Sequence, residues 1–145
     1  MSAEPGRVMA LDIGGRRIGV ALSDPARILA SPLLTLPAQP RPRALDRIDE
    51  LVRQHQVADV VVGLPLTLSG EIGPQAKLVQ AFVAELRERL AVPVHEFDER
   101  LTSVEAERIL AEAGVKPDQR RARIDAVAAS IILRDFLESR RARDA

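Results

Sequence analysis

Four acidic residues fall where the sequence predicts the ends of structural elements. Asp12 ends the first predicted strand, and Asp98 and Glu99 end the last predicted strand. Asp125 lies in the first turn of the last predicted helix. In open α/β sheets, ligands bind in the crevice at the carboxyl ends of parallel strands. If the first and last strands are parallel neighbours, and the last helix packs across them, these carboxylates converge in that crevice.

A cluster of carboxylates indicates a bound divalent cation. Carboxylates without cationic partners repel one another and raise each other's pKa, and a metal ion relieves that repulsion. The donors are hard oxygens, because the chain has no Cys and two His, so Mg²⁺ or Mn²⁺ is favoured over zinc. Two such ions can activate water and stabilise the leaving oxygen during phosphodiester hydrolysis. The expected chemistry is therefore cleavage of a phosphodiester.

Each acid also has a purely structural interpretation. Asp12 could cap the glycine-rich turn that follows it, and Asp125 could interact with the helix dipole. Asp98 or Glu99 could pair with Arg100 at the surface. The convergence of acids from three separate segments favours a functional site over these alternatives.

The pattern of apolar residues predicts an α/β fold with a mixed sheet. The predicted strands cover residues 8–11, 18–22, 28–36, 59–63 and 92–97. The predicted helices cover residues 44–55, 75–90, 102 to about 114, and 122–138. Because the first three strands form an antiparallel meander and the later ones alternate with helices, we expect helices on both faces. Pro32 predicts an edge position or a bulge for the third strand. Small residues should let the last helix approach the sheet closely: Ala126, Ala128, Ala129 and Ser130.

The composition sets the broad class of protein. The chain has 145 residues, of which 46% are hydrophobic and 29% charged, as expected of one globular domain. The absence of Cys excludes a disulfide scaffold, a thiol nucleophile and a thiolate zinc site. With no Trp or Tyr and three Phe, single-strand binding by base stacking is not expected. No apolar run is long enough to span a membrane, and residues 1–7 lack a signal peptide's apolar stretch. We therefore expect a cytoplasmic protein without a membrane partner.

Positive and negative charges are equal in number but unevenly distributed. The formal net charge is zero, with 21 basic and 21 acidic residues. Residues 60–112 are predominantly acidic and residues 113–145 predominantly basic, which could place carboxylates beside a phosphate-binding flank. His95 alternates with its strand neighbours and is expected to be structural. Six arginines are candidates for contact with nucleic acid, with a solvated surface role as the alternative: Arg16, Arg17, Arg100, Arg120, Arg121 and Arg123.

Four segments together resemble one nuclease family. They are LDIGGRRIGVALSD at 11–24, VVGLPLTLSGEIGPQA at 61–76, DERLTSVEAERIL at 98–110 and IDAVAASIIL at 124–133. In this order they resemble the YqgF/RuvX family, which has an RNase H-like fold and is related to the RuvC Holliday junction resolvases. The resemblance covers residues 8–138. It implies one RNase H-like domain over 1–145, with a five-stranded mixed sheet, a core at about 7–138 and a basic tail at 139–145.

The resemblance also implies roles for the acids. By resemblance, Asp12, Glu99 and Asp125 are the catalytic residues that bind the metal. Neighbouring residues of a strand face opposite sides of the sheet, so the sequence leaves open whether Asp98 or Glu99 points into the site. Glu99 is chosen as the ligand, and Asp98 is retained as the alternative catalytic acid.

The resemblance implies a nuclease dependent on Mg²⁺ or Mn²⁺ that acts in 5′-end processing of precursor 16S ribosomal RNA (pre-16S rRNA). The alternative is a Holliday junction resolvase acting on DNA four-way junctions, which would need a dimer. A further alternative is a non-catalytic nucleic-acid-binding module, although such a module gains nothing from carboxylates that face phosphates. An actin-like ATPase is suggested by the acid–glycine turn alone, but it needs two such domains and no P-loop is visible. The choices between structured RNA and branched DNA, and between a monomer and a homodimer, stay open.

Overall fold

The structure is a computed structural model, and it describes residues 4–99 and 102–144. Its elements are, in chain order, β1 (Arg7–Ile13), β2 (Arg17–Ser23), β3 (Ala30–Pro37), α1 (Arg41–Gln54), β4 (Val57–Pro65), α2 (Pro74–Arg89), β5 (Val94–Glu99), α3 (Thr102–Glu112) and α4 (Pro117–Asp144). Within these residues, no helix is both long and apolar enough to cross a membrane.

The strands form a five-stranded sheet in the order β3-β2-β1-β4-β5. β2 pairs antiparallel with β1 and β3, whereas β4 runs parallel to β1 and β5. The expected mixed sheet, a meander followed by two parallel strands, is therefore confirmed. β3 is an edge strand, and its register with β2 shifts between Val20 and Ala21, the latter paired with Pro32. The condition set for convergence of the strand-end acids is met only in part: β1 and β5 run parallel, but they are not neighbours, because β4 lies between them.

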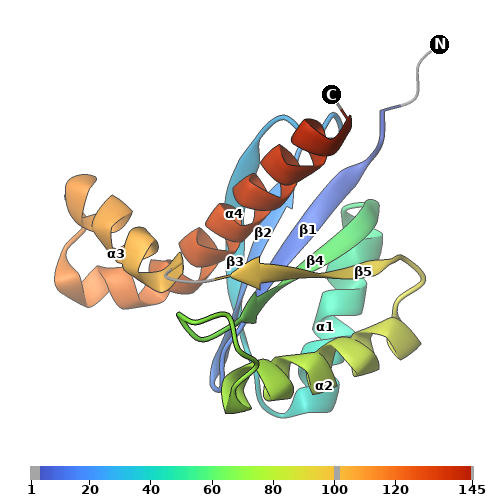
Figure 1. Ribbon diagram of the computed structural model, residues 1–145, viewed down its shortest axis with the longest axis horizontal. Coiled ribbons are helices and arrows are strands. Elements are labelled where there is room, and N and C mark those ends of the chain that lie inside the picture. Colours follow the sequence, from blue (N-terminus) through green and yellow to red (C-terminus); the bar gives the residue numbers. More distant parts are fainter. Residues whose placement is uncertain (1–3, 100–101, 145) are drawn as a thin grey trace.

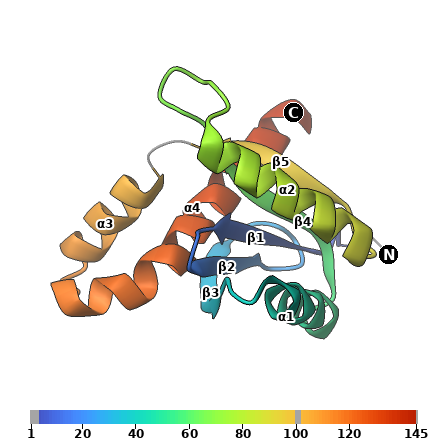
Figure 2. The ribbon, with the colours of Figure 1, turned by 90° about the horizontal axis from the view of Figure 1, so that it is seen from below.

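Helices cover both faces of the sheet, as Figures 1 and 2 show. α1 and α2 lie on one face, where their apolar residues and those of the strands form the larger core. α4 lies across the other face and forms a second core with β1, β2 and β4. α3 packs against α4, through Ala106 on α3 and Ala128 and Ile131 on α4. The sheet is thus the middle layer, and α4 is the element that crosses the face opposite α1 and α2.

Strand alternation decides which face of β1 each residue occupies. Met9 and Leu11 belong to the core under α1 and α2, whereas Val8 and Ala10 belong to the core under α4. Because successive side chains of a strand point to opposite faces, Asp12 lies on the α4 face, at the carboxyl end of β1.

The last helix is longer than predicted at both ends. It spans Pro117–Asp144 rather than 122–138, so residues 117–121 and most of the expected basic tail are helical. Pro117 suits the first turn of a helix, because the N–H that it lacks needs no partner there. Asp125 consequently lies in the third turn and not in the first. Since the helix dipole acts within the first turn, it does not account for Asp125.

Candidate active site

A glycine in β2 lets α4 lie directly on the sheet beside Asp12. Gly19 pairs with Asp12 across the β1–β2 hairpin. A Cβ atom at Gly19 would overlap the backbone carbonyl oxygen of Asp125, so the helix backbone occupies the space that a side chain would need. This close approach brings Asp12 and Asp125, which are far apart in the sequence, to one place on the α4 face.

Asp12 holds its proton more tightly than an ordinary aspartate. Its side chain is half-buried. This burial, and secondly the negative charge of Asp125, raise the pKa of Asp12 from 3.8 to about 6. Two carboxylates that repel each other in this way are stabilised by a cation between them. Asp12 and Asp125 are therefore the part of the predicted acidic cluster that the structure brings together.

An arginine from β2 already neutralises one of these aspartates. The Nε–H of Arg17 donates a hydrogen bond to Oδ2 of Asp125 at 2.6 Å. The Arg17 side chain is 44% exposed and that of Asp125 20% exposed, so the pair lies at the edge of the site and in contact with solvent. Arg17 was expected to contact nucleic acid, and its carboxylate partner was not foreseen.

Glu99 lies on the same face of the sheet as Asp12. Phe97, two residues earlier in β5, packs edge-to-face on Phe136 of α4. Because side chains alternate along a strand, Glu99 shares the face of Phe97, whereas Asp98 lies on the opposite face, where it is exposed. The alternation therefore favours Glu99 over Asp98 as the acid of β5 that faces the site.

Glu99 nevertheless stands apart from the two aspartates. β4 separates β5 from β1, and two strand spacings amount to about 10 Å. A Cβ atom at Gly63 of β4 would lie 3.5 Å from the Cβ of Glu99, so Glu99 lies beside β4 and not beside β1. Among the residues that the structure describes, no group of three or more His, Cys, Asp or Glu is placed to hold a metal ion. Of the three predicted ligands, Asp12 and Asp125 come together and Glu99 does not join them.

Two carboxylates are nevertheless a suitable donor set for a hard divalent cation. Mg²⁺ usually keeps several waters and is held by one or two carboxylates together with substrate phosphates. Asp12 and Asp125 supply oxygens of this kind, and the raised pKa of Asp12 marks a place where positive charge is favourable. Zinc, which prefers nitrogen and sulfur ligands, does not fit these donors.

The other candidate arginines lie in different surroundings. Arg16 is exposed in the turn between β1 and β2. Arg120 donates to the carbonyl oxygen of Val115 and pairs with Glu107 at 2.9 Å, so it joins α3 to α4. Arg123 is exposed and lines a hollow of about 330 Å³ between β3, α3 and α4. Two candidates lie outside the described part of the chain: Arg100 and the side chain of Arg121.

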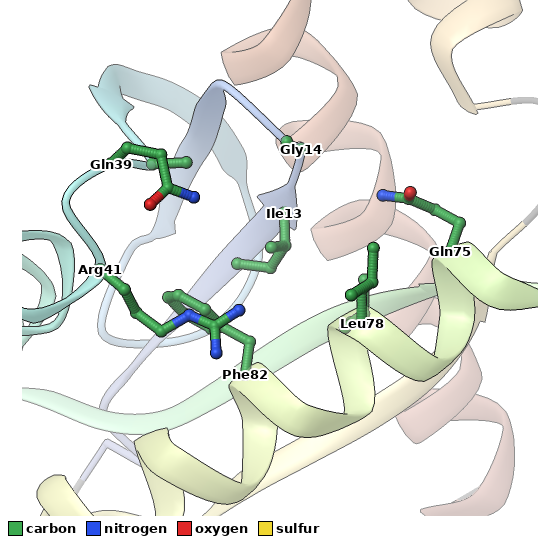
Figure 3. Close-up of a pocket in the computed structure, with 10 residues that line it drawn as sticks. Ile13, Gly14, Gln39, Arg41, Gln75, Leu78 and Phe82 are labelled. Atoms are coloured by element: carbon green, nitrogen blue, oxygen red, sulfur yellow. The ribbon is translucent and has the colours of Figure 1, made fainter.

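A pocket of about 140 Å³ lies on the other side of the sheet, between the β1–β2 turn and α2 (Figure 3). Its lining includes Ile13, Leu78 and Phe82. Ile13 and Asp12 are successive residues of β1, so they point to opposite faces. The pocket therefore belongs to the α1–α2 side of the molecule and is separate from the aspartate pair.

A second charged network lies at the opposite end of the sheet, where β4 and β5 begin. Asp59 pairs with Arg27 at 2.6 Å and with His95 at 2.9 Å. Burial acts to raise the pKa of Asp59, but the hydrogen bonds with His95 and Arg27 outweigh it and hold that pKa below its usual value. His95 also lies against the ring of Phe136. The structure thus gives His95 a packed, hydrogen-bonded position, in agreement with the structural role expected for it.

Two features of the site were missed from the sequence. Close approach of α4 was attributed to small residues on the helix, whereas the decisive gap is Gly19 on the strand. A signal was present, because a glycine inside a strand often marks a place where another backbone comes close. The pairing of Arg17 with Asp125 has no comparable signal, because nothing local connects the two residues.

This sheet, crossed by a helix that carries an aspartate to the end of the first strand, has an RNase H-like fold. RuvC of Thermus thermophilus, solved in complex with a Holliday junction substrate, is similar with a TM-score of 0.57 at 17% identity, over 93% of this chain and 95% of that chain. The fowlpox virus Holliday junction resolvase is similar with a TM-score of 0.54 at 14% identity, over 92% of this chain and 99% of that chain. At these identities the similarity concerns the fold.

Comparison with known sequences identifies the family to which the chain belongs. The chain belongs to the RuvX family, described as Holliday junction resolvase, whose family model matches residues 6–139. A protein of Roseiflexus sp. described as "Putative pre-16S rRNA nuclease" is 65% identical over 97% of this chain and 100% of its own length. A protein of Chloroflexus aurantiacus with the same description is 54% identical over 92% of this chain and 88% of its own length. The family expected from the sequence is thus confirmed, and the chain is a phosphodiester hydrolase.

Proposed function

We propose that this protein is a nuclease that uses Mg²⁺ or Mn²⁺ to process the 5′ end of pre-16S rRNA in the cytoplasm. The observation that carries the catalytic part is the convergence of Asp12 and Asp125 where α4 crosses β1 and β2. The relatives described as pre-16S rRNA nucleases, at up to 65% identity, support the choice of RNA substrate.

Asp12 and Asp125 would hold the cation. When bound, the ion polarises the phosphodiester and activates water. Asp12 must lose its proton to serve as a ligand, and its pKa of about 6 leaves it ionised at neutral pH. Glu99, which lies on the same face of the sheet at the end of β5, would be a third acid available to the substrate. Arg17, which pairs with Asp125, and the exposed Arg16 and Arg123 would orient the backbone phosphates.

The test is a cleavage assay with three substrates: a pre-16S rRNA fragment with its 5′ leader, duplex RNA, and a DNA four-way junction. Each is incubated with Mg²⁺ and with Mn²⁺. We expect the leader to be removed, and the Asp12→Asn variant to be slower by a factor of about 100 or more. Glu138→Gln, which changes an exposed carboxylate on α4, is the control and should keep full activity. Equal activity of wild type and Asp12→Asn would show that this aspartate has no catalytic role.

A second function, resolution of DNA four-way junctions, is favoured by the description of the family model. Symmetric cleavage of two strands requires two active sites related by a two-fold axis. This function therefore predicts a dimer in light scattering and paired nicks in the junction. Salt-sensitive binding of all three substrates without cleavage under either metal would instead indicate a non-catalytic module.

A further inference from the structure

The ion pair between Arg17 and Asp125 engages one of the two carboxylate oxygens of a predicted metal ligand. The Arg17 Nε lies 2.6 Å from Oδ2 of Asp125, which is a short, charge-assisted hydrogen bond. A cation bound to the same carboxylate would lie close to the positively charged guanidinium, and the two positive charges would repel each other. The cation and the guanidinium therefore compete for Asp125.

The surroundings of Arg17 allow this competition to be resolved by movement. Arg17 is the first residue of β2 and follows the Gly14–Gly15 turn. Its side chain is 44% exposed, so it can leave Asp125 without opening the core. By contrast, Asp125 is held in place by α4, whose backbone rests on Gly19. When charge balance changes, the arginine is the partner that is free to turn towards solvent.

The balance of charge favours displacement by a divalent ion. Asp12 and Asp125 together carry two negative charges when ionised, and Arg17 offers one positive charge to one of them. A divalent cation between the aspartates satisfies both and repels a guanidinium nearby. The displaced guanidinium then lies at the edge of the site, where a backbone phosphate is the anion available to it.

We propose that Arg17 is the counter-ion of Asp125 in the metal-free protein, that the divalent cation displaces it, and that the released guanidinium then binds a phosphate of the nucleic acid. This inference rests on the proposed metal-dependent function. Arg17 is a positioning residue in the metal-free protein, because it acts through Asp125, and it becomes a substrate contact after metal binding. The exchange couples the two binding events, since the phosphate contact becomes available only when the metal is in place.

The first experiment measures Mn²⁺ binding without substrate, by the electron paramagnetic resonance signal of the free ion. Wild type is compared with Arg17→Gln, Arg17→Lys, Asp12→Asn and Arg16→Gln. The Arg17→Gln variant lacks the competing positive charge, so it should bind Mn²⁺ about ten times more tightly than wild type does. Arg17→Lys should lie between wild type and Arg17→Gln. Arg16→Gln removes an equal charge from the neighbouring exposed position, and its affinity should stay within about twofold of wild type.

The second experiment follows the Arg17 side chain of the wild-type protein by nuclear magnetic resonance, and then compares RNA binding by the wild type and two variants. The Nε–H resonance of Arg17, assigned by its absence in Arg17→Lys, should shift when saturating Mg²⁺ is added, and its exchange with water should accelerate. Binding of the pre-16S rRNA fragment is then measured by fluorescence anisotropy with Ca²⁺ in place of Mg²⁺. Arg17→Gln should weaken this binding about fivefold, and Arg17→Lys should restore most of it.

The outcomes separate this inference from the proposed function. If Asp12→Asn loses Mn²⁺ binding while Arg17→Gln binds as wild type does, Arg17 is not a competitor and the inference is wrong, although the metal site stands. An Nε–H resonance that is unchanged at saturating Mg²⁺ leads to the same conclusion. If wild type binds no Mn²⁺ and Asp12→Asn cleaves RNA normally, the proposed function itself fails, and the exchange fails with it.

Discussion

Replacement of Asp12 by Asn should stabilise the metal-free protein at neutral pH. The ionised carboxylate is unfavourable there, because burial and the charge of Asp125 raise the pKa of Asp12 from 3.8 to about 6. Each tenfold change in proton affinity corresponds to about 1.4 kcal/mol, so this rise corresponds to about 3 kcal/mol at pH 7. Asn removes the charge but keeps a polar group that needs hydrogen bonds. We therefore expect a net gain of about 1–3 kcal/mol in the free energy of unfolding.

The pH dependence follows from the direction of the shift. The unfolded chain releases the Asp12 proton near pH 3.8, whereas the folded protein retains it until about pH 6. Between these values the folded state binds more protons, so the contribution of Asp12 to stability falls as the pH rises through this window. Above this pH window, the loss of stability caused by the ionised Asp12 is complete. The difference between the Asn variant and wild type should therefore be small below pH 4 and full above pH 7.

The assay is urea denaturation followed by circular dichroism, in EDTA, at several values between pH 4 and pH 8. In thermal denaturation of the same samples, a gain of about 1–3 kcal/mol should appear as a rise of roughly 3–10 °C in Tm. Added Mg²⁺ should stabilise wild type and have little effect on the variant. Glu138→Gln, which removes an exposed carboxylate, should show no such dependence. A variant that is less stable than wild type at pH 7.5, or a difference that is constant with pH, would refute the assigned burial and repulsion of Asp12.

Three further predictions concern the elements that position the site. Gly19→Ala should lower the free energy of unfolding by about 3 kcal/mol, because the added Cβ would meet the backbone of α4. Gly15→Ala is the control: a Cβ there would meet nothing within 4 Å, so it should change the free energy of unfolding by less than about 0.5 kcal/mol. Urea denaturation measures both variants. Glu99→Gln should lower the cleavage rate at least about tenfold while Asp98→Asn stays near wild type, and the reverse order would contradict the assignment of faces in β5. Asp59→Asn should lower the free energy of unfolding by about 1 kcal/mol at pH 7 without affecting cleavage. Because the pKa of Asp59 is depressed in the folded protein, this loss of stability should disappear as the pH falls below 3.8. A loss that persists in acid would show that the contribution of Asp59 is not electrostatic.

Much of the fold could be predicted, because local patterns report burial. The run Val60–Val62 predicts a strand covered on both faces, and in the structure Val60 and Val62 face α1 and α2 while Val61 faces α4. Thr102 was predicted to begin a helix, and α3 begins there. These predictions succeed because the spacing of apolar residues along a segment shows which of its side chains are buried, and that spacing is visible in the sequence.

The predictions that failed depend on contacts between distant segments. The first two turns of α4 lack an apolar period, and Arg120 ties this part of the helix to Glu107 of α3. The position of β4 between β1 and β5 is likewise a choice of strand pairing, and no local pattern specifies it. As a consequence, Asp12 and Glu99 end up two strands apart.

The kinds of acid and their places at the ends of elements follow from the sequence alone, because strand and helix boundaries depend on neighbouring residues. Which acids meet does not follow from it. Asp125 reaches Asp12, and Arg17 reaches Asp125, because α4 rests on Gly19 and because β1 and β2 pair in one register. The positions of these side chains relative to one another are set by the packing of α4 on the sheet. That packing depends on contacts along the whole chain, and the glycine within β2 marks the place of close approach without naming the residue that comes there.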